Sequence, residues 1–237
     1  MKHVKLSLTA LSVFVSCAAF AQTADEVISK HIEAIGGAKA WDKVKTIKLL
    51  GSTSAQGTEI EMNKTFINGK ASRMDISAMG MKGYMIFTTT KGWSYLPFMG
   101  QTDPIEIPGD AMKSVVDEYD FKSAQVASKA LIASATIDGN DTIDNKPCIK
   151  VKVTDKLGNT KECYFDATTY YLLKTEQSVK IQDQQQEMAY TYSNHKKQAD
   201  GIVVPMTISQ MQGDWNIKTV EVNKTVDDKI FAPEKKK

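Results

Sequence analysis

The stretch MGMKGYMIFTTTKGWSYLPF, residues 79–98, decides the fold class of this chain. Large apolar residues stand at the odd positions Met79, Met81, Met85 and Phe87, while the even positions are mostly polar. A period of two predicts a strand with one apolar and one polar face. Methionine is flexible and adapts to apolar partners of varied shape. The apolar face is therefore either a wall that receives an apolar ligand or an ordinary sheet core that uses methionine.

The strand pattern continues on both sides of this stretch. Alternating segments joined by short turns recur from residue 46 to residue 222, with a break between Pro104 and about residue 130. This spacing predicts about eleven antiparallel strands in one large curved sheet or barrel. The fold class is mainly β with helices.

A helix is expected at the start of the mature chain. Thr23 and Glu26 fit a capping box, and Ile28 and Ile32 begin an apolar stripe that Gly36-Gly37 ends. A second short helix is expected over residues 38–44. Both helices need a sheet against which to bury their apolar sides.

The mid-chain break predicts one amphipathic helix from residue 111 to about residue 121, with Asp110 as its N-cap. Met112, Val115, Val116 and Tyr119 form a stripe at helical spacing. Such a helix inside a β-protein is either a fixed plug of an open barrel or a movable lid over an apolar cavity.

The first 21 residues have the pattern of a signal peptide. Lys2 and Lys5 precede an apolar run that is too short to span a bilayer, and Ala19-Phe20-Ala21 fits a cleavage site. The expected mature protein, residues 22–237, is exported, and its length suits one all-β domain or two small ones. An alternative is a lipid anchor on Cys17.

The charge balance excludes one class of partner. The first 21 residues carry two of the 30 Lys and Arg residues and none of the 28 Asp and Glu residues, so the mature chain has no formal net charge. Nucleic-acid binding then lacks its main electrostatic contribution. Arg73 is the only arginine, which leaves few options for bidentate anion clamps.

Cys148 and Cys163 lie on one predicted hairpin. An odd register sum would place both on one face, where they could form a disulfide, whereas an even sum would place them on opposite faces. The sequence leaves both alternatives open.

The mature chain contains no recognisable catalytic set. His31 and His195 lack a neighbouring nucleophile pattern and are expected at the surface. The adjacent acids Asp117 and Glu118 are expected to be solvated. We therefore predict no catalytic residue, no metal site and no cofactor.

Several segments, in order along the mature chain, together resemble one family. They are residues 24–37 (ADEVISKHIEAIGG), 44–47 (VKTI), 91–97 (KGWSYLP), 164–169 (YFDATT), 200–205 (DGIVVP) and 231–233 (FAP). This pattern is similar to that of the LolA-like outer-membrane lipoprotein-sorting proteins. Trp93, Tyr95 and Pro97 match the family's strand after the glycine turn. The family's arginine-proline pair near the cavity mouth is absent, because the corresponding stretch reads Phe66-Ile-Asn-Gly69.

The resemblance implies an unclosed antiparallel β-barrel of about eleven strands, covered by an N-terminal helix and a mid-chain lid helix. It also implies a monomeric periplasmic carrier, not an enzyme, whose apolar cavity binds acyl chains of lipids or lipoproteins, with an outer-membrane acceptor protein as a further partner. The alternative is a structural or envelope-interaction domain whose barrel is filled by its own side chains. A cavity below about 300 Å³ would favour that alternative. The expected cavity residues are Ile60, Met62, Met79, Met81, Met85, Phe87, Trp93, Tyr95, Met112, Val115, Val116 and Tyr119.

Overall fold

The computed structural model describes residues 22–55, 57–109, 111–181, 184–211 and 213–234. The predicted signal peptide, the alternative anchor at Cys17 and the predicted cap at Asp110 lie outside the described residues. Among the described residues, no helix has the length and apolar character needed to cross a membrane.

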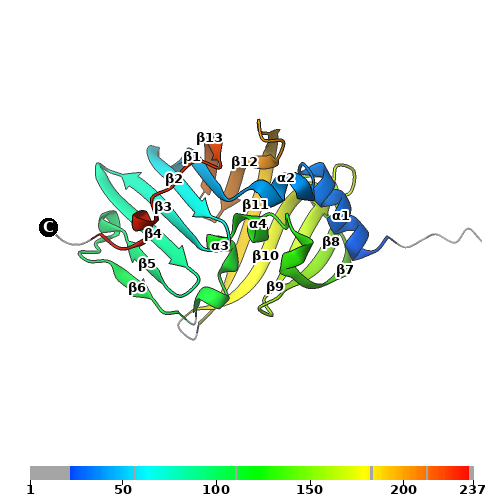
Figure 1. Cartoon of the computed structure of the whole chain (residues 1–237), viewed down its shortest axis with the longest axis horizontal. Helices are drawn as coiled ribbons and strands as arrows, with labels where there is room; N and C mark the ends of the chain where they lie inside the picture. Colours follow the sequence, from blue (N-terminus) through cyan, green and yellow to red (C-terminus); the bar gives the residue numbers. More distant parts are fainter. Residues whose placement is uncertain (1–21, 56, 110, 182–183, 212, 235–237) are drawn as a thin grey trace, which may run out of the picture.

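One antiparallel sheet organises the described chain (Figure 1). Its strand order is β6-β5-β4-β3-β2-β1-β13-β12-β11-β10-β9-β8-β7, so nearly all neighbours in sequence are also neighbours in the sheet. The strands are β1 Thr46–Ala55, β2 Thr58–Ile67, β3 Ala71–Ala78, β4 Met81–Thr88, β5 Gly92–Tyr95, β6 Ile105–Ile107, β7 Ile132–Ile143, β8 Lys146–Asp155, β9 Thr160–Asp166, β10 Leu172–Ile181, β11 Gln184–Lys197, β12 Val203–Gln210 and β13 Gly213–Val222.

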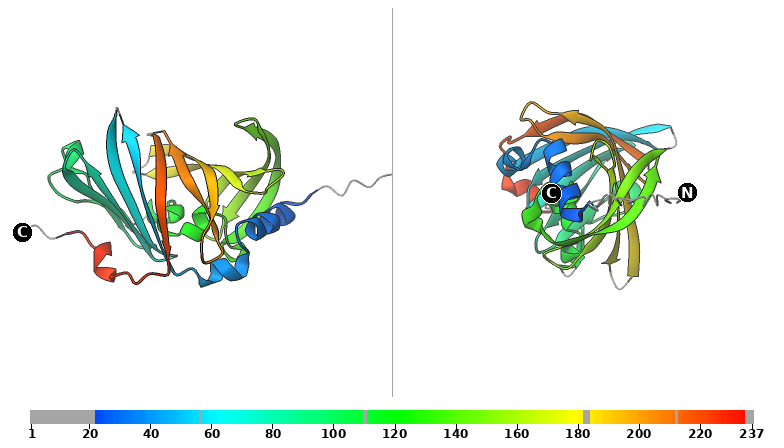
Figure 2. Two further views of the ribbon diagram at one scale, coloured as in Figure 1. Left: turned by 90° about the horizontal axis from the view of Figure 1, so that it is seen from above. Right: turned by 90° about the vertical axis from the view of Figure 1, so that its right-hand side faces the viewer.

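The sheet is strongly curved but does not close, as Figure 2 shows. Strands β6 and β7 stand at its two ends. The unclosed antiparallel half-barrel is therefore confirmed, with 13 strands in the described part of the chain in place of about eleven. Strand β6 escaped the sequence pattern because it has three residues and lies between Pro104 and Pro108.

Helices α1 (Ala24–Ala34) and α2 (Ala38–Lys43) cover one end of the hollow, on its open side (Figure 1). The predicted capping box is present, because Thr23 and Glu26 bond each other's backbone N–H groups. After α1 the chain turns at Gly36, whose φ is +115°. A Cβ atom there would lie 2.4 Å from the backbone oxygen of Gly201, so this contact requires glycine.

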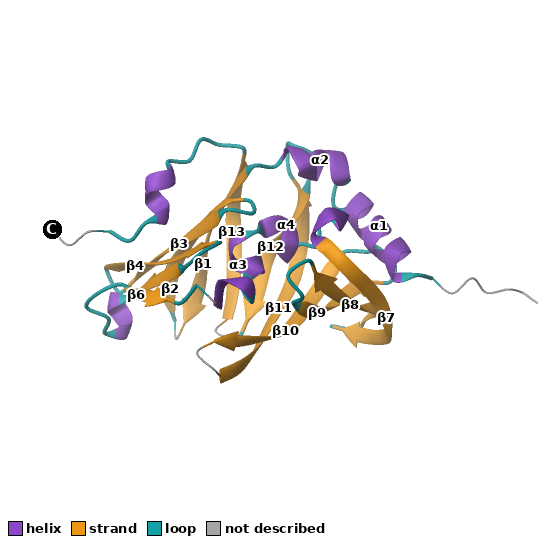
Figure 3. Ribbon diagram, turned by 60° about the horizontal axis from the view of Figure 1, so that its bottom comes forward, coloured by secondary structure: helices purple, strands orange, loops and turns teal. Residues whose placement is uncertain are grey.

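The mid-chain segment, defined here as residues 111–131, is not the single helix that the sequence pattern predicts. It forms four short pieces instead: η2 Ala111–Lys113, α3 Val116–Tyr119, α4 Phe121–Ala124 and η3 Lys129–Leu131. Asp120 is extended (φ −125°, ψ 101°), and its carboxylate caps α4 by accepting bonds from the N–H groups of Lys122 and Ser123. This local side-chain capping competes with helix continuation and ends α3. Figure 3 shows α3 and α4 within the hollow of the sheet.

The strand register assigns each residue to one of two faces. Leu49, Lys64, Met74 and Met85 lie in one row across β1 to β4, on what we call the inner face. The main core lies on this face, where α1, α2 and α4 pack against it, with Trp41, Phe66 and Phe121 in ring contact. The opposite, outer face carries smaller clusters, one of which includes Phe231 of η4 (Asp228–Phe231).

The strand register also determines whether Cys148 and Cys163 can form a disulfide. Cys148 pairs with Asp166, and Val151 pairs with Cys163, so the register sum is even. The two thiols therefore point to opposite faces, and both cysteines are free and buried. Of the two alternatives, the structure selects the one without a disulfide.

Candidate functional site

A small apolar cluster joins β4 to the mid-chain segment. Phe87, Met112, Val115 and Tyr119 are buried in it, and Met112 has no exposed surface. Met85 and Val116 pack against its margin. Six of the predicted cavity residues thus come together between the inner face and the mid-chain segment, and they fill the space with their own side chains.

The other predicted residues of the methionine face lie farther from this cluster. Ile60 and Met62 share the inner face, and Met62 packs against the main core. Met79 and Met81 lie at the tip of the β3–β4 hairpin, where their exposed fractions are 73% and 39%. The ligand-binding role of these residues stays a prediction.

Trp93 and Tyr95 do not extend the methionine face. Trp93 pairs with Ile86 and Tyr95 pairs with Tyr84, so both lie on the outer face. They pack there with Phe231 of η4, near the C-terminus. The prediction that these two residues extend the methionine face as its next strand is wrong. The β4–β5 turn sets an odd register sum, so the odd-numbered residues of β5 share a face with the even-numbered residues of β4.

The inner face also holds a buried ion pair that sequence reasoning missed. Lys64 Nζ lies 2.7 Å from Glu118 Oε2, with side-chain exposures of 9% and 18%. The hydroxyl of Tyr190 donates to the other oxygen, Oε1, at 2.7 Å. Ser72 donates its hydroxyl to the backbone oxygen of Glu118. Glu118 thus links α3 to three strands, β2, β3 and β11.

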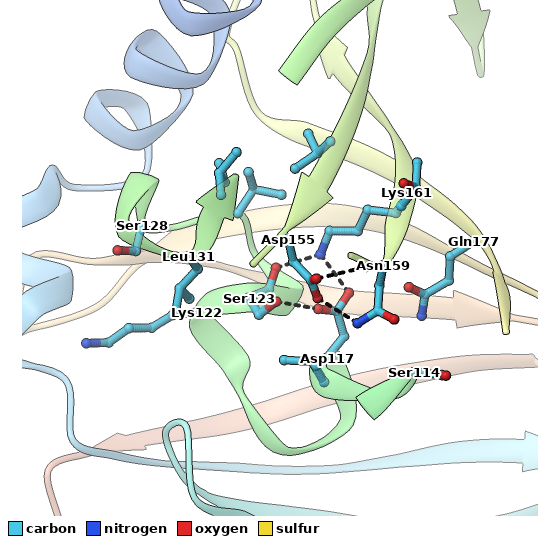
Figure 4. A pocket seen from close by; sticks show the side chains of 15 residues that line it. Ser114, Asp117, Lys122, Ser123, Ser128, Leu131, Asp155, Asn159, Lys161 and Gln177 are labelled. Atoms are coloured by element: carbon cyan, nitrogen blue, oxygen red, sulfur yellow. Dashed lines mark hydrogen bonds and ion pairs between the residues drawn. The ribbon is translucent and has the colours of Figure 1, made fainter. Parts of the chain in front are cut away.

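A second ion pair holds the other side of the segment, as Figure 4 shows. Lys161 Nζ lies 2.7 Å from Asp117 Oδ2 and donates to the backbone oxygen of Ser123 at 2.7 Å. The hydroxyl of Ser123 donates to Asp117 Oδ1. The expectation that Asp117 and Glu118 are solvated is wrong. One signal was available, since Lys64 and Lys161 each stand at an inner-face position of an amphipathic strand.

The charges at this site stabilise each other. Burial alone raises the pKa of Glu118, but the Lys64 ammonium and the hydrogen bonds from Lys64 and Tyr190 outweigh it, so the pKa falls below its ordinary value of 4.5. Burial lowers the pKa of Lys161, but the charge of Asp117 outweighs it and the pKa is raised. Glu118 and Lys161 are therefore ionised near neutral pH.

We expect Glu118→Gln to change how stability depends on acidity. Because the folded protein lowers the pKa of Glu118, its ionic contribution is complete above the unfolded value of about 4.5 and is lost as pH falls through the folded pKa. Urea unfolding from pH 7 to pH 3 should show the wild type losing its advantage over the variant in acid. A difference that stays constant over this range would contradict the ionic role of Glu118.

Two spaces adjoin the mid-chain segment. A small, partly open pocket of about 20 Å³ lies beside Asp117, Ser123 and Lys161. An open cleft of about 740 Å³ lies at the rim, where side chains of β8 to β11 meet Ser114 and the β8–β9 turn. Of the apolar residues predicted to form the cavity, Val116 alone borders the small pocket, and none lines the open cleft.

The described residues show no group of three or more His, Cys, Asp or Glu side chains that could hold a metal ion. His31 is buried, against expectation, and its two ring nitrogens each lie 2.8 Å from a backbone oxygen, of Tyr170 and of Gln125. It thereby joins α1 to the end of α4 and to the β9–β10 turn. His195 is partly buried and stacks on Tyr171. Both histidines have structural contacts.

Comparisons with known proteins identify the fold through solved structures. No protein-family model and no curated protein matches the sequence. Among solved structures, a LolA superfamily protein from Nitrosomonas europaea matches with TM-score 0.53 and 14% identity, over 90% of this chain and 98% of that one. An outer membrane lipoprotein-sorting protein domain from Vibrio parahaemolyticus matches with TM-score 0.52 and 13% identity, over 87% and 94%.

A DUF1329 family protein from Desulfovibrio piger matches with TM-score 0.51 and 13% identity, over 88% of this chain and 97% of that one. In all three matches nearly the whole half-barrel is shared. The chain therefore has the LolA-like fold.

Proposed function

We propose that this chain is an exported, periplasmic carrier or binder of acyl chains, and that the acyl chain of a lipid or lipoprotein enters the hollow of the half-barrel. The carrier would act as a single domain, residues 22–237, by binding and release and without catalysis. The LolA-like fold supports this proposal, since two of the solved structures that share the fold are named for lipoprotein sorting or the LolA superfamily.

One observation carries the proposal: the inner face is apolar and is covered by a segment of short helical pieces. Met112, Val115 and Tyr119 of this segment lie against Phe87 and Met85 of β4. Short helical pieces have little stability of their own and depend on tertiary contacts. The cover is therefore the part of the structure best suited to move.

An acyl chain could take the place of the apolar side chains that the mid-chain segment packs against the inner face. If the segment swings away, the apolar surface it leaves is free to bury methylene groups, each worth about 0.8 kcal/mol. Met85 and Met112 would adapt to chains of different shape because methionine has a flexible, polarizable side chain. Release would follow when the segment returns and displaces the chain.

Uptake and exposure of the cover can be measured together. We expect a fluorescent fatty acid to bind the mature protein, and hydrogen exchange to rise in residues 111–131 on binding while β8 and β9 stay protected. Native mass spectrometry after mild purification should show co-purifying lipid. Absence of both lipid and fluorophore binding would refute the proposal.

A second candidate is a structural or envelope-interaction domain with a self-filled barrel. The pocket of about 20 Å³ beside Asp117 and Lys161 favours it, because ligand pockets usually exceed about 300 Å³, and the open cleft of about 740 Å³ lies at the rim and is lined by none of the predicted cavity residues. For this candidate, hydrogen exchange in residues 111–131 would stay low and unchanged in the presence of lipid. The same experiment therefore separates the two functions.

A further inference from the structure

We infer that the preferred ligand of the hollow is an acyl chain that ends in an oxyanion, such as a fatty carboxylate, and that Glu118 occupies the head-group position when no ligand is bound. This inference rests on the proposed acyl-chain binding and specifies its ligand class. The site consists of Lys64 and Tyr190, with Ser72 beside them.

The carboxylate of Glu118 is bound as a ligand would be. Lys64 of β2 and Tyr190 of β11 each approach a different oxygen of that carboxylate, both at 2.7 Å. Ser72 of β3 supplies a third donor, to the backbone oxygen of the same residue. All three donors belong to the sheet, whereas the acceptor belongs to the mid-chain segment. Removal of the segment would leave two donors, from Lys64 and Tyr190, placed to bind the two oxygens of one carboxylate, with the Ser72 hydroxyl beside them.

The position of Lys64 argues for a role beyond stability. It stands in the inner-face row between Leu49 and Met74, where burial of an ammonium group is costly. Replacing a buried ion pair by apolar side chains is often neutral or stabilising. A self-filled half-barrel therefore has no need of a lysine here, but a site that recognises an anion does.

The second ion pair makes a neutral ligand still less suitable. Lys161 stands at the inner-face position next to Val153, and its partner Asp117 is also part of the segment. When the segment moves, both ammonium groups lose their partners together. A neutral ligand that covers them would leave two desolvated charges, whereas an oxyanion head group restores one pair directly.

The test compares ligands that have the same chain and different heads. Palmitate and hexadecyl phosphate carry an oxyanion, and monopalmitoylglycerol is neutral. By titration calorimetry at pH 7.5, we expect the wild type to bind the two anionic ligands at least ten times more tightly than the neutral one. Acetate and inorganic phosphate, which lack the chain, should not bind measurably.

Variants then assign the preference to the site. Glu118→Gln removes the internal carboxylate, and we expect it to bind palmitate several-fold more tightly. Lys64→Gln combined with Glu118→Gln keeps a hydrogen-bonding pair without charge, and we expect the preference for the anionic ligands to fall several-fold, with the remainder due to Lys161. Asp228→Asn is the matched control, because the Lys70–Asp228 pair has the same 2.7 Å length but lies at the surface with 60% and 65% exposure.

The outcomes are distinct. Equal binding of palmitate and monopalmitoylglycerol by the wild type overturns the inference and leaves the proposed function standing. A charge preference that is undiminished in the double variant overturns the assignment to Lys64 and Glu118. Binding of acetate or phosphate alone, as tight as palmitate, overturns the role of the chain. Failure of all three chain-bearing ligands to bind refutes the proposed function itself.

Discussion

Lys64→Met is expected to lower the free energy of unfolding by about 3–5 kcal/mol, which is the usual range when one partner of a buried ion pair is removed. The loss has one main cause. The Glu118 carboxylate keeps the hydroxyl of Tyr190 but no longer has a counter-charge 2.7 Å away. The fold would then favour protonation of Glu118 or release of α3 from the inner face. Chemical unfolding followed by fluorescence measures the effect.

A double-mutant cycle separates the ion pair from the packing of Lys64. In the background of Lys64→Met, the further change Glu118→Gln should recover part of the loss, because the introduced amide still accepts a bond from Tyr190 and carries no charge. The surface variant Lys70→Met should cost less than about 1 kcal/mol, as is typical of exposed pairs. Strictly additive effects of Lys64→Met and Glu118→Gln would contradict the coupling that the structure shows.

Met85→Asp is expected to destabilise the protein by about 2–4 kcal/mol, because it places a carboxylate without a partner in the cluster of Phe87, Met112 and Tyr119. The mid-chain segment should loosen with it. Limited proteolysis is then expected to cleave residues 111–131 faster in the variant than in the wild type. For the fraction that stays folded, the proposed function also predicts weaker uptake of acyl chains.

Met81→Asp is the matched control for this substitution. Met81 lies on the same strand and the same face as Met85 but at the exposed hairpin tip. We expect a change within about 0.5 kcal/mol and unchanged proteolysis. Similar effects of both substitutions would show that the cluster between β4 and the mid-chain segment does not hold the cover.

Local sequence rules predicted the elements that short-range physics controls. The capping box at Thr23 forms because the two side chains and the N–H groups they bind lie within one helical turn. The period of two in residues 79–88 correctly predicted a strand, since a pleated backbone fixes that period. The expected polar face is wrong, because Tyr84 and Ile86 are buried on the outer face in the cluster that includes Phe231. The short turns between such strands predicted an antiparallel sheet, and the family resemblance implied that the sheet does not close.

The same rules failed in the mid-chain segment, where a helical spacing of apolar residues meets a residue that caps a new helix. Met112, Val115 and Tyr119 do reach one apolar cluster, as their spacing predicted, but not on one helix. Asp120 bonds the backbone ahead of it and breaks the helix, and tertiary contacts rather than helix continuity then hold the apolar side chains in place. Apolar spacing alone cannot distinguish these two arrangements.

The sequence by itself therefore determined most of the strands, their antiparallel order and the capped first helix, and its family resemblance pointed to an unclosed half-barrel. Only the tertiary structure decided which residues of neighbouring strands share a face. It thereby placed Trp93 and Tyr95 on the outer face, and it placed Cys148 and Cys163 on opposite faces. It also decided that Glu118 meets Lys64 and Tyr190, which are distant in the chain. The physical reason is that periodicity describes one strand at a time, whereas turn register and the folding of α3 into the hollow set which charges meet.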